Sequence, residues 1–230
     1  MFVVNADQAR SRSSEDLIPA ALSVLEALPL RPALGFERTV GDEIQGVLAS
    51  GADVVAACRA LAEVGEWHVA VGLGTVQRPY PASTRAARGG AFLAARRAAE
   101  EVKGRAPSVL VVGQLPATTS DPEALDPNRA TVDDADTALG LLATIWRRRT
   151  DGGWAAVQAT ERVRAKDSKA ALSTVAKELG ISHQALSQRL RSADWELETK
   201  ALGTVARLLD RADAAVAAAT QNPTESEETS

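Results

Sequence analysis

The segment ALSTVAKELGISHQALSQRLRSADW, residues 171–195, constrains the fold of this chain most, because small, flexible and apolar residues recur in it at one spacing. A first helix is predicted from about residue 169 to 179, and Gly180 permits the turn that a helix interior resists. Small Ala176 lets two helices cross closely, and apolar Ile181 fills the space between them. This spacing predicts a helix-turn-helix.

The second helix of this motif begins after Ser182, which caps it, and turns Leu186 and Leu190 inward. Early residues of such a helix reach base edges in the major groove, whereas basic residues around it contact phosphates. The residues predicted to bind DNA are Lys169, Lys177, Ser182, His183, Gln184, Ser187, Gln188, Arg189 and Arg191. The alternative is a helical hairpin that contacts another protein.

The distribution of charge favours DNA as the partner of this region. The whole chain has a net charge of −4, yet residues 141–211 carry 13 Lys or Arg against 8 Asp or Glu. A local basic surplus around such a motif is typical of a DNA-binding domain. Because one recognition helix covers only a half-site, a homodimer on double-stranded DNA is expected.

Prolines, turn formers and acids between residues 113 and 137 interrupt the apolar periodicity. We therefore predict a domain over 1–115, a linker over 116–130, an all-α helix-turn-helix domain over 131–220, and a disordered acidic tail over 221–230. The helices flanking the motif are expected to pack on it or on a second subunit. With no membrane span, no signal peptide and a single cysteine that reads as a core residue, a cytoplasmic protein is expected.

Before the linker, extended and helical patterns alternate in the order β-α-β-β-α-β-α-β. The strands are expected over 1–6, 35–41, 44–49, 66–76 and 108–113, and the helices over 13–29, 53–64 and 91–104. This order predicts an α+β fold with an antiparallel, ferredoxin-like sheet and helices on one of its faces.

Two groups of residues in this domain are candidates for a ligand site. Asp42 and Glu43 follow Gly41 in a predicted hairpin turn, and Asp7 ends the first strand, so three carboxylates could meet and bind Mg²⁺. The alternative is a plain turn, since Asp and Gly are ordinary turn residues. A second group lies at the start of a predicted helix, where free N–H groups favour a phosphate: Arg85, Arg88, Gly89 and Gly90. Its alternative is a flexible basic loop.

Several short motifs together resemble the SatD family of bacterial proteins over about residues 2–112. They are Asp7 with Ser11 and Arg12, then GDEIQG at 41–46, and VAVGLGTV at 69–76. More distantly, their order is similar to the class III nucleotidyl cyclase fold, and RGGAFLAARRA is similar to a helix motif of those enzymes. SatD relatives carry a helix-turn-helix segment after this domain.

The resemblance implies roles for particular residues. Asp7 and Asp42 would be the metal ligands for Mg²⁺ with a nucleotide, Arg12 would belong to the ligand site, and Arg97 matches the transition-state arginine, although a shift of one residue would select Arg96. Leu93 stands where cyclases have an asparagine, and leucine cannot stabilise charge on a phosphate.

The sequence therefore predicts a DNA-binding transcriptional regulator whose cyclase-like domain binds a nucleotide or another anionic ligand and modulates DNA binding. Leu93 argues against enzymatic cyclisation. Two alternatives stay open: an active nucleotidyl cyclase or related phosphoryl-transfer enzyme, and a regulator in which the cyclase-like domain serves only for dimerisation.

Overall fold

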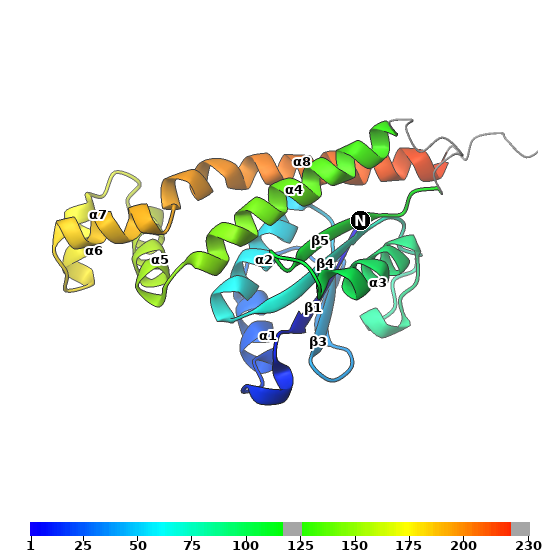
Figure 1. Cartoon of the computed structure of the whole chain (residues 1–230), viewed down its shortest axis with the longest axis horizontal. Helices are drawn as coiled ribbons and strands as arrows, with labels where there is room; N and C mark the ends of the chain where they lie inside the picture. The colour runs from blue at the N-terminus through cyan, green and yellow to red at the C-terminus, as the bar shows by residue number, and fades with distance from the viewer. Residues whose placement is uncertain (117–125, 222–230) are drawn as a thin grey trace, which may run out of the picture.

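The computed structural model describes residues 1–116 and 126–221, in which one five-stranded sheet is accompanied by eight α-helices (Figure 1). In chain order the elements are β1 (Phe2–Gln8), α1 (Ile18–Ala27), β2 (Leu34–Arg38), β3 (Glu43–Leu48), α2 (Gly51–Val64), β4 (Trp67–Leu73), α3 (Gly90–Val102), β5 (Val109–Gly113), α4 (Pro127–Arg148), α5 (Asp151–Lys166), α6 (Leu172–Glu178), α7 (His183–Ser192) and α8 (Trp195–Gln221). Short 3-10 helices span Ser11–Ser13 and Thr84–Ala86. The α+β class and the predicted order of elements before the linker are confirmed.

The strand order of the sheet is β2-β3-β1-β4-β5. The first four strands are antiparallel to their neighbours, in the ferredoxin-like order, but β5 pairs with β4 in parallel. The sheet is thus mixed rather than wholly antiparallel as expected. The reason is that α3 separates β4 from β5, and a helical crossover returns the chain in the same direction.

Helices cover both faces of the sheet, which corrects the expectation of one covered face. Alternate residues of a strand point to opposite faces, so Phe2 and Val4 enter the large core with α1 and α2, while Val3 packs beneath α3. Helix α3 can approach closely because β4 carries Gly72, where any Cβ would overlap the backbone of Ala91. Continuous apolar runs such as FVV in β1 are the sequence signal of a strand buried on both sides.

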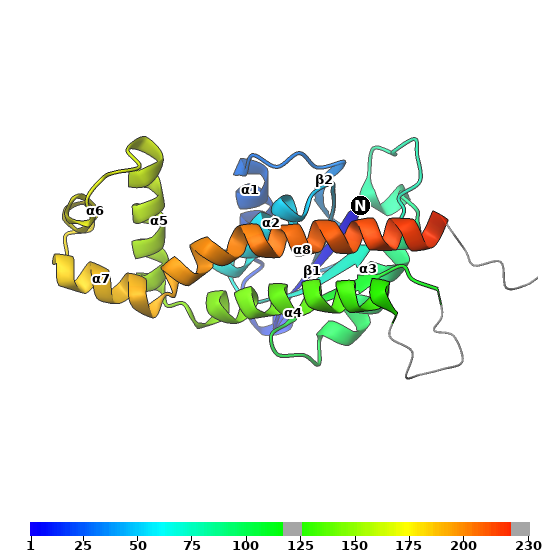
Figure 2. The same ribbon diagram turned by 90° about the horizontal axis from the view of Figure 1, so that it is seen from above.

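Helices α4 and α8 lie side by side across the face of the sheet that α1 and α2 also cover (Figure 2). Leu139 and Leu142 of α4 and Leu209 of α8 belong to the same buried core as Phe2. These helices were expected to pack on the helix-turn-helix or on a second subunit, and that expectation is wrong for their apolar stripes. Without them, the apolar side chains of β5 on this face would be exposed to water.

The helices between α4 and α8 form a separate small body, which we call the three-helix unit (α5, α6 and α7). Its core contains Val157, Val175, Leu186 and Leu190. As predicted, Gly180 has a positive φ of 65° at the turn between α6 and α7. The first helix of the motif begins at residue 172 rather than 169. This unit stands at one end of the molecule, away from the sheet (Figure 1).

Helix α4 begins at Pro127, inside the range predicted as a linker. The middle of that linker and the predicted acidic tail from residue 222 lie outside the described residues. None of the helices described has the length and apolar character needed to cross a membrane.

Candidate functional site

A polar pocket opens on the face of the sheet that α3 covers only in part. Its floor contains Asn5 and Asp7 of β1 beside Glu43 and Gln45 of β3. The strand register pairs Asn5 with Gln45 and Asp7 with Glu43, so the four side chains share one face. Gln45 Nε2 donates to Asn5 Oδ1 at 2.6 Å, so these two amides are hydrogen-bonded to each other across the strands. We call this site the sheet pocket.

Residues of α3 and of the loop before it form the opposite wall of the sheet pocket. Phe92 and Arg96 lie one helical turn apart on α3, Lys103 follows its end, and Arg85 comes from the loop. The cavity between wall and floor has a volume of about 520 Å³, within the usual size of small-molecule sites. Lys103 Nζ donates to Asp7 Oδ2 at 3.1 Å and so joins the wall to the floor.

The loop that carries Arg85 is held in place by Glu37 of β2. Glu37 Oε1 accepts hydrogen bonds from Ser83 Oγ at 2.6 Å and from the Thr84 backbone N–H and hydroxyl at 2.6 and 2.7 Å. These donors favour the ionised carboxylate, and the hydroxyls of Ser83 and Thr84 lower the pKa of Glu37. Arg85 also donates to the carbonyl oxygen of Arg38 at 2.5 Å, so its position at the pocket is fixed from two sides.

The three carboxylates expected to bind Mg²⁺ are not grouped as one set of metal ligands. Asp7 and Glu43 are cross-strand partners, but Asp42 lies in the turn before β3 and does not line the pocket. Asp7 is paired with Lys103, and Glu43 Oε1 accepts from Thr39 Oγ1 at 2.6 Å. In residues 1–116 and 126–221, no three His, Cys, Asp or Glu side chains are grouped as metal ligands. The residues present do not fit a preformed Mg²⁺ site.

The amino terminus of α3, expected to hold a phosphate, is occupied by the protein itself. The N–H groups of Gly90 and Ala91 donate to the hydroxyl and carbonyl oxygens of Thr75, at 3.3 and 3.1 Å. A Cβ on Gly90 would overlap the side chain of Gln114, so this glycine serves close packing. A Cβ on Gly89 would overlap the backbone of Thr75, and Gly89 has a positive φ of 144°.

Of the four arginines proposed for the ligand site, only Arg85 lines the sheet pocket. Arg12 and Arg88 are exposed outside it. Arg97 points to the end of β5, where it donates to the Gly113 carbonyl oxygen at 3.1 Å. Its neighbour Arg96 lines the pocket instead, because successive residues of a helix are turned by about 100°.

Sequence reasoning did not identify several residues of the sheet pocket, among them Asn5, Gln45, His68 and Lys103. A signal for one of them exists in β1, where Asn5 interrupts an apolar run and is 8% exposed. A buried polar side chain in a strand requires a partner, so it marks a polar surface beyond the strand. Lys103 carries no comparable signal, since its position depends on how α3 crosses the sheet.

A second candidate site is the outer face of α7 in the three-helix unit. Ser182 Oγ accepts from the N–H of Ala185 at 3.1 Å, which is the predicted cap. With Leu186 and Leu190 buried, the helix turns Gln184, Gln188 and Arg191 to solvent, and Ser187 is half-buried beside them. His183 is exposed at the start of the same helix, and Lys169 and Lys177 are exposed on and before α6.

Arg189 is exposed on the flank of α7 that faces the start of α5, where it and Gln188 line the same hollow. A Cβ built on Gly152 of α5 would lie 3.6 Å from Arg189 Cζ, so the guanidinium packs beside the start of α5. Arg189 is also about 100° around the helix from Gln188. Its placement therefore differs from that of the other residues predicted to contact DNA.

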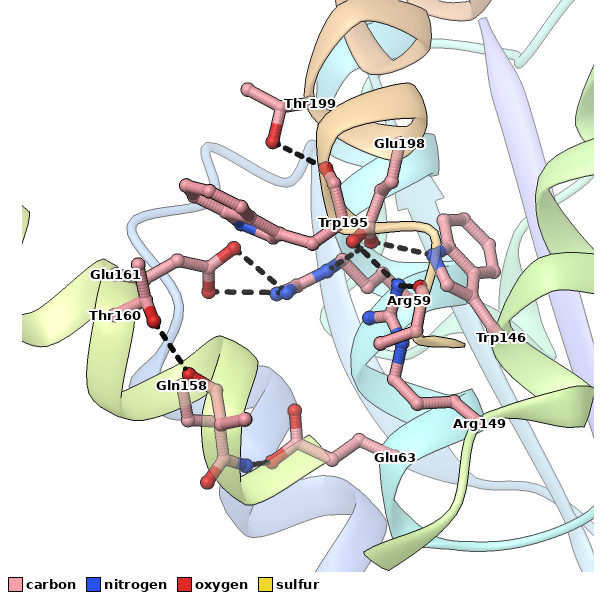
Figure 3. A network of polar contacts seen from close by, with 12 residues as sticks. Arg59, Glu63, Trp146, Arg149, Gln158, Thr160, Glu161, Trp195, Glu198 and Thr199 are labelled. Carbon is pink, nitrogen blue, oxygen red and sulfur yellow. Dashed lines mark hydrogen bonds and ion pairs between the residues drawn. The ribbon is translucent and has the colours of Figure 1, made fainter. Parts of the chain in front are cut away.

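The three-helix unit is tied to the rest of the protein by a buried polar network (Figure 3). At its centre, Glu198 of α8 is 1% exposed and accepts from Arg59 Nε of α2 at 2.7 Å. It also accepts from Trp146 Nε1 at 2.7 Å and from an Nη nitrogen of Arg149 at 2.8 Å. Arg149 further donates to the carbonyl oxygen of Ala193, just after α7, at 2.6 Å.

Arg59 extends the network to α5, because its Nη2 donates to both carboxylate oxygens of Glu161 at 2.9 and 3.0 Å. Burial alone would raise the pKa of Glu198, but the hydrogen bond from Arg149 and the charge of Arg59 lower it. Burial raises the pKa of Glu161. Two guanidinium groups thus share two carboxylates, of which Glu198 is buried and Glu161 is partly exposed to water.

No protein-family model, curated protein or solved structure matches this chain. The resemblance to the SatD family therefore stays a prediction from the motifs.

Proposed function

We propose that the protein is a cytoplasmic DNA-binding transcriptional regulator, and that its sheet pocket binds a nucleotide or another anionic ligand. The observation that carries this proposal is the pair α6 and α7, whose buried face is apolar and whose outer face is polar and free. Ala176 is buried where the helices cross, and Gly180 makes the turn. This is the arrangement in which a second helix enters the major groove.

The side chains on the outer face of α7 suit recognition of bases. Gln184 and Gln188 can each form two hydrogen bonds with adenine, and Ser187 can donate or accept. Arg191, Lys169 and Lys177 would contact phosphates and supply affinity that falls with salt. A homodimer would place two such helices on two half-sites.

The sheet pocket is lined by three cations and by three carboxylates, Asp7, Glu43 and Glu100. Asp7 is paired with Lys103 and Glu43 accepts from Thr39, so the support for an anionic ligand comes from the donors on the wall. Arg85, Arg96 and Lys103 stand on the wall, opposite the paired amides of Asn5 and Gln45 on the floor. A phosphate could take donors from the cations while a base or sugar met the amides. Lys103 already neutralises Asp7 at 3.1 Å, so we expect binding without Mg²⁺.

A ligand changes DNA affinity only if it binds one arrangement of the protein better than another. The buried network around Glu198 is the connection through which the sheet domain could influence the three-helix unit. The first experiment selects fragments from a genomic pool with the full-length protein, with and without a nucleotide mixture, each with and without Mg²⁺. Specific enrichment that depends on nucleotides supports both parts of the proposal.

Matched variants test the DNA-binding part. Gln188→Ala should weaken specific binding by about 1–3 kcal/mol, and Arg191→Ala should lower the salt dependence by about one phosphate contact. Arg189→Ala, on the flank of α7, is the control and should change little. If no fragment is enriched, or if Arg189→Ala and Gln188→Ala have equal effects on specific binding, α7 does not read DNA in this way.

A second matched pair tests the sheet pocket. Arg96→Ala should weaken binding of the nucleotide on which the enrichment of DNA fragments depends. Arg97→Ala should not, because Arg97 contacts Gly113 instead. Titration calorimetry measures both. Equal losses in the two variants, or DNA binding that is indifferent to nucleotides, would leave a DNA-binding protein whose sheet domain acts as a scaffold.

A further inference from the structure

The outer side of α4 carries a row of three exposed side chains, which we call the outer stripe (Asp134, Leu141 and Arg148). They follow one another at intervals of seven residues, and seven residues complete nearly two turns of an α-helix, so the three share one side of α4. This side points away from the apolar residues of α4 that pack on the sheet. Figure 2 shows α4 and α8 in front of the sheet, with no other described element over them.

Leu141 gives the outer stripe an apolar centre, because its side chain is 65% exposed. Ala138 and Ile145 lie three residues before it and four residues after it, so they share its side of the helix. Both are half-buried against the core and leave part of their apolar surface uncovered. A single exposed leucine is ordinary on a protein surface, so Leu141 alone does not identify an interface. The charges on either side of it supply the second observation.

The two charges of the outer stripe, on Asp134 and Arg148, form no ion pair within the described part of the chain. They stand fourteen positions apart on one continuous helix, which is about 21 Å, so they cannot meet within one copy of the protein. The whole of α4 divides in the same way. Residues 127–137 carry three Asp against one Arg, and residues 138–148 carry two Arg and no acid.

We infer that a second copy of this chain packs on the outer stripe, with the two α4 helices antiparallel and the two Leu141 side chains together at the twofold axis. Reversal of one helix about residue 141 places its Arg148 opposite Asp134 of the other helix, and the symmetry repeats this pair. The negative first half of each helix then faces the positive second half of the other.

A second copy is the occupant that fits because the outer stripe is its own complement. Asp134 and Arg148 are equally far from Leu141, and a twofold interface requires this kind of self-complementary patch. The inference gives a location to the homodimer of the proposed function and rests on that part of it alone. Self-association is measured without DNA, so a failure to bind DNA would leave the inference standing.

Sedimentation equilibrium of the full-length protein without DNA tests the pairing of charges. We expect a monomer–dimer equilibrium over about a hundredfold range of protein concentration. Asp134→Arg and Arg148→Asp should each weaken dimerisation at least about tenfold, because each places two pairs of like charges across the interface. The double variant exchanges the two charges and should restore dimerisation to within about threefold of the wild type. Glu26→Arg is the control, because it changes the net charge as Asp134→Arg does, at an exposed position of α1.

Single cysteine substitutions test the register of the two helices. The one native cysteine, Cys58, is buried, so a disulfide between two copies formed in air must come from the substituted position. Leu141→Cys should cross-link two copies, because the two positions meet at the axis. Asp134→Cys should not, since its two copies would be about 21 Å apart along the helices, beyond the reach of a disulfide.

Four results would overturn the inference. They are a monomer at every concentration, charge reversals that weaken dimerisation no more than Glu26→Arg does, reversals that the double variant does not rescue, and cross-linking at position 134 as fast as at position 141. Because all the substituted residues are exposed, the variants should fold, and far-UV circular dichroism checks this.

Discussion

Replacing Glu198 with glutamine tests how the three-helix unit is held to the sheet domain. The substitution keeps the shape of the side chain but removes the charge that Arg59 and Arg149 share. It also places an amide N–H₂ where donors already point at the carboxylate. Because Glu198 is 1% and Arg149 0% exposed, water cannot replace the lost partner.

The expected loss in the free energy of unfolding is large. Breaking a buried ion pair by removing one partner costs about 3–5 kcal/mol, a substantial part of the roughly 5–15 kcal/mol that stabilises an ordinary folded protein. Urea unfolding measures it, followed both by tryptophan fluorescence and by far-UV circular dichroism. If the two signals separate in the variant, the three-helix unit has lost its attachment before the sheet domain unfolds.

Glu161→Gln is the matched control, because it removes the other carboxylate of the same network. Glu161 is 42% exposed, so water can solvate Arg59 in its place, and a loss of at most about 1 kcal/mol is expected. A loss below about 1 kcal/mol for Glu198→Gln, or equal losses in the two variants, would refute the view that burial gives this network its importance.

Three further outcomes are expected. The pKa of Glu198 is lowered in the folded protein, so its ionised form stabilises the fold at pH values above the ordinary pKa of 4.5. This stabilisation is lost as the pH falls through the lower folded pKa. Unfolding midpoints measured below pH 4.5 should therefore fall more in the wild type than in Glu198→Gln. Burial raises the pKa of Cys58 to about 12, so native protein should resist thiol-labelling reagents at pH 8 until urea unfolds it. Gly72→Ala should prevent stable folding by forcing α3 from the sheet, whereas Gly35→Ala, with open space around it, should behave as wild type in a thermal melt.

Much of the fold follows from local patterns. Apolar alternation and turn residues predicted each element of the sheet domain in order, and the spacing of Ala176, Gly180 and Leu186 predicted α6 and α7. What local patterns could not give was the partner of each apolar face. The apolar stripes of α4 and α8 pack on the apolar face of the sheet that α1 and α2 leave partly uncovered. This packing depends on contacts between residues far apart in sequence.

The candidate sites were predictable to different degrees. The cap and outer face of α7 depend on helical spacing alone, and the structure has them as predicted. The sheet pocket depends on register and crossing angle, so Glu43 rather than Asp42 faces Asp7, and Arg96 rather than Arg97 enters the pocket. A change of one position reverses a strand residue and turns a helix residue by about 100°, which motif comparison cannot resolve.

The three-helix unit is an insertion between α4 and α8. It leaves from the end of α4 and returns at the start of α8, and these two helices pack against each other on the sheet. The side chain of Arg149 bonds to the carbonyl oxygen of Ala193, so exit and return lie close together. Insertions with adjoining ends can be exchanged without rebuilding their host. Chimeras that replace residues 155–194, and so keep Trp154 in the core of the sheet domain, should therefore keep that domain folded, whereas a fragment cut at residue 115 would lack two helices of its own core.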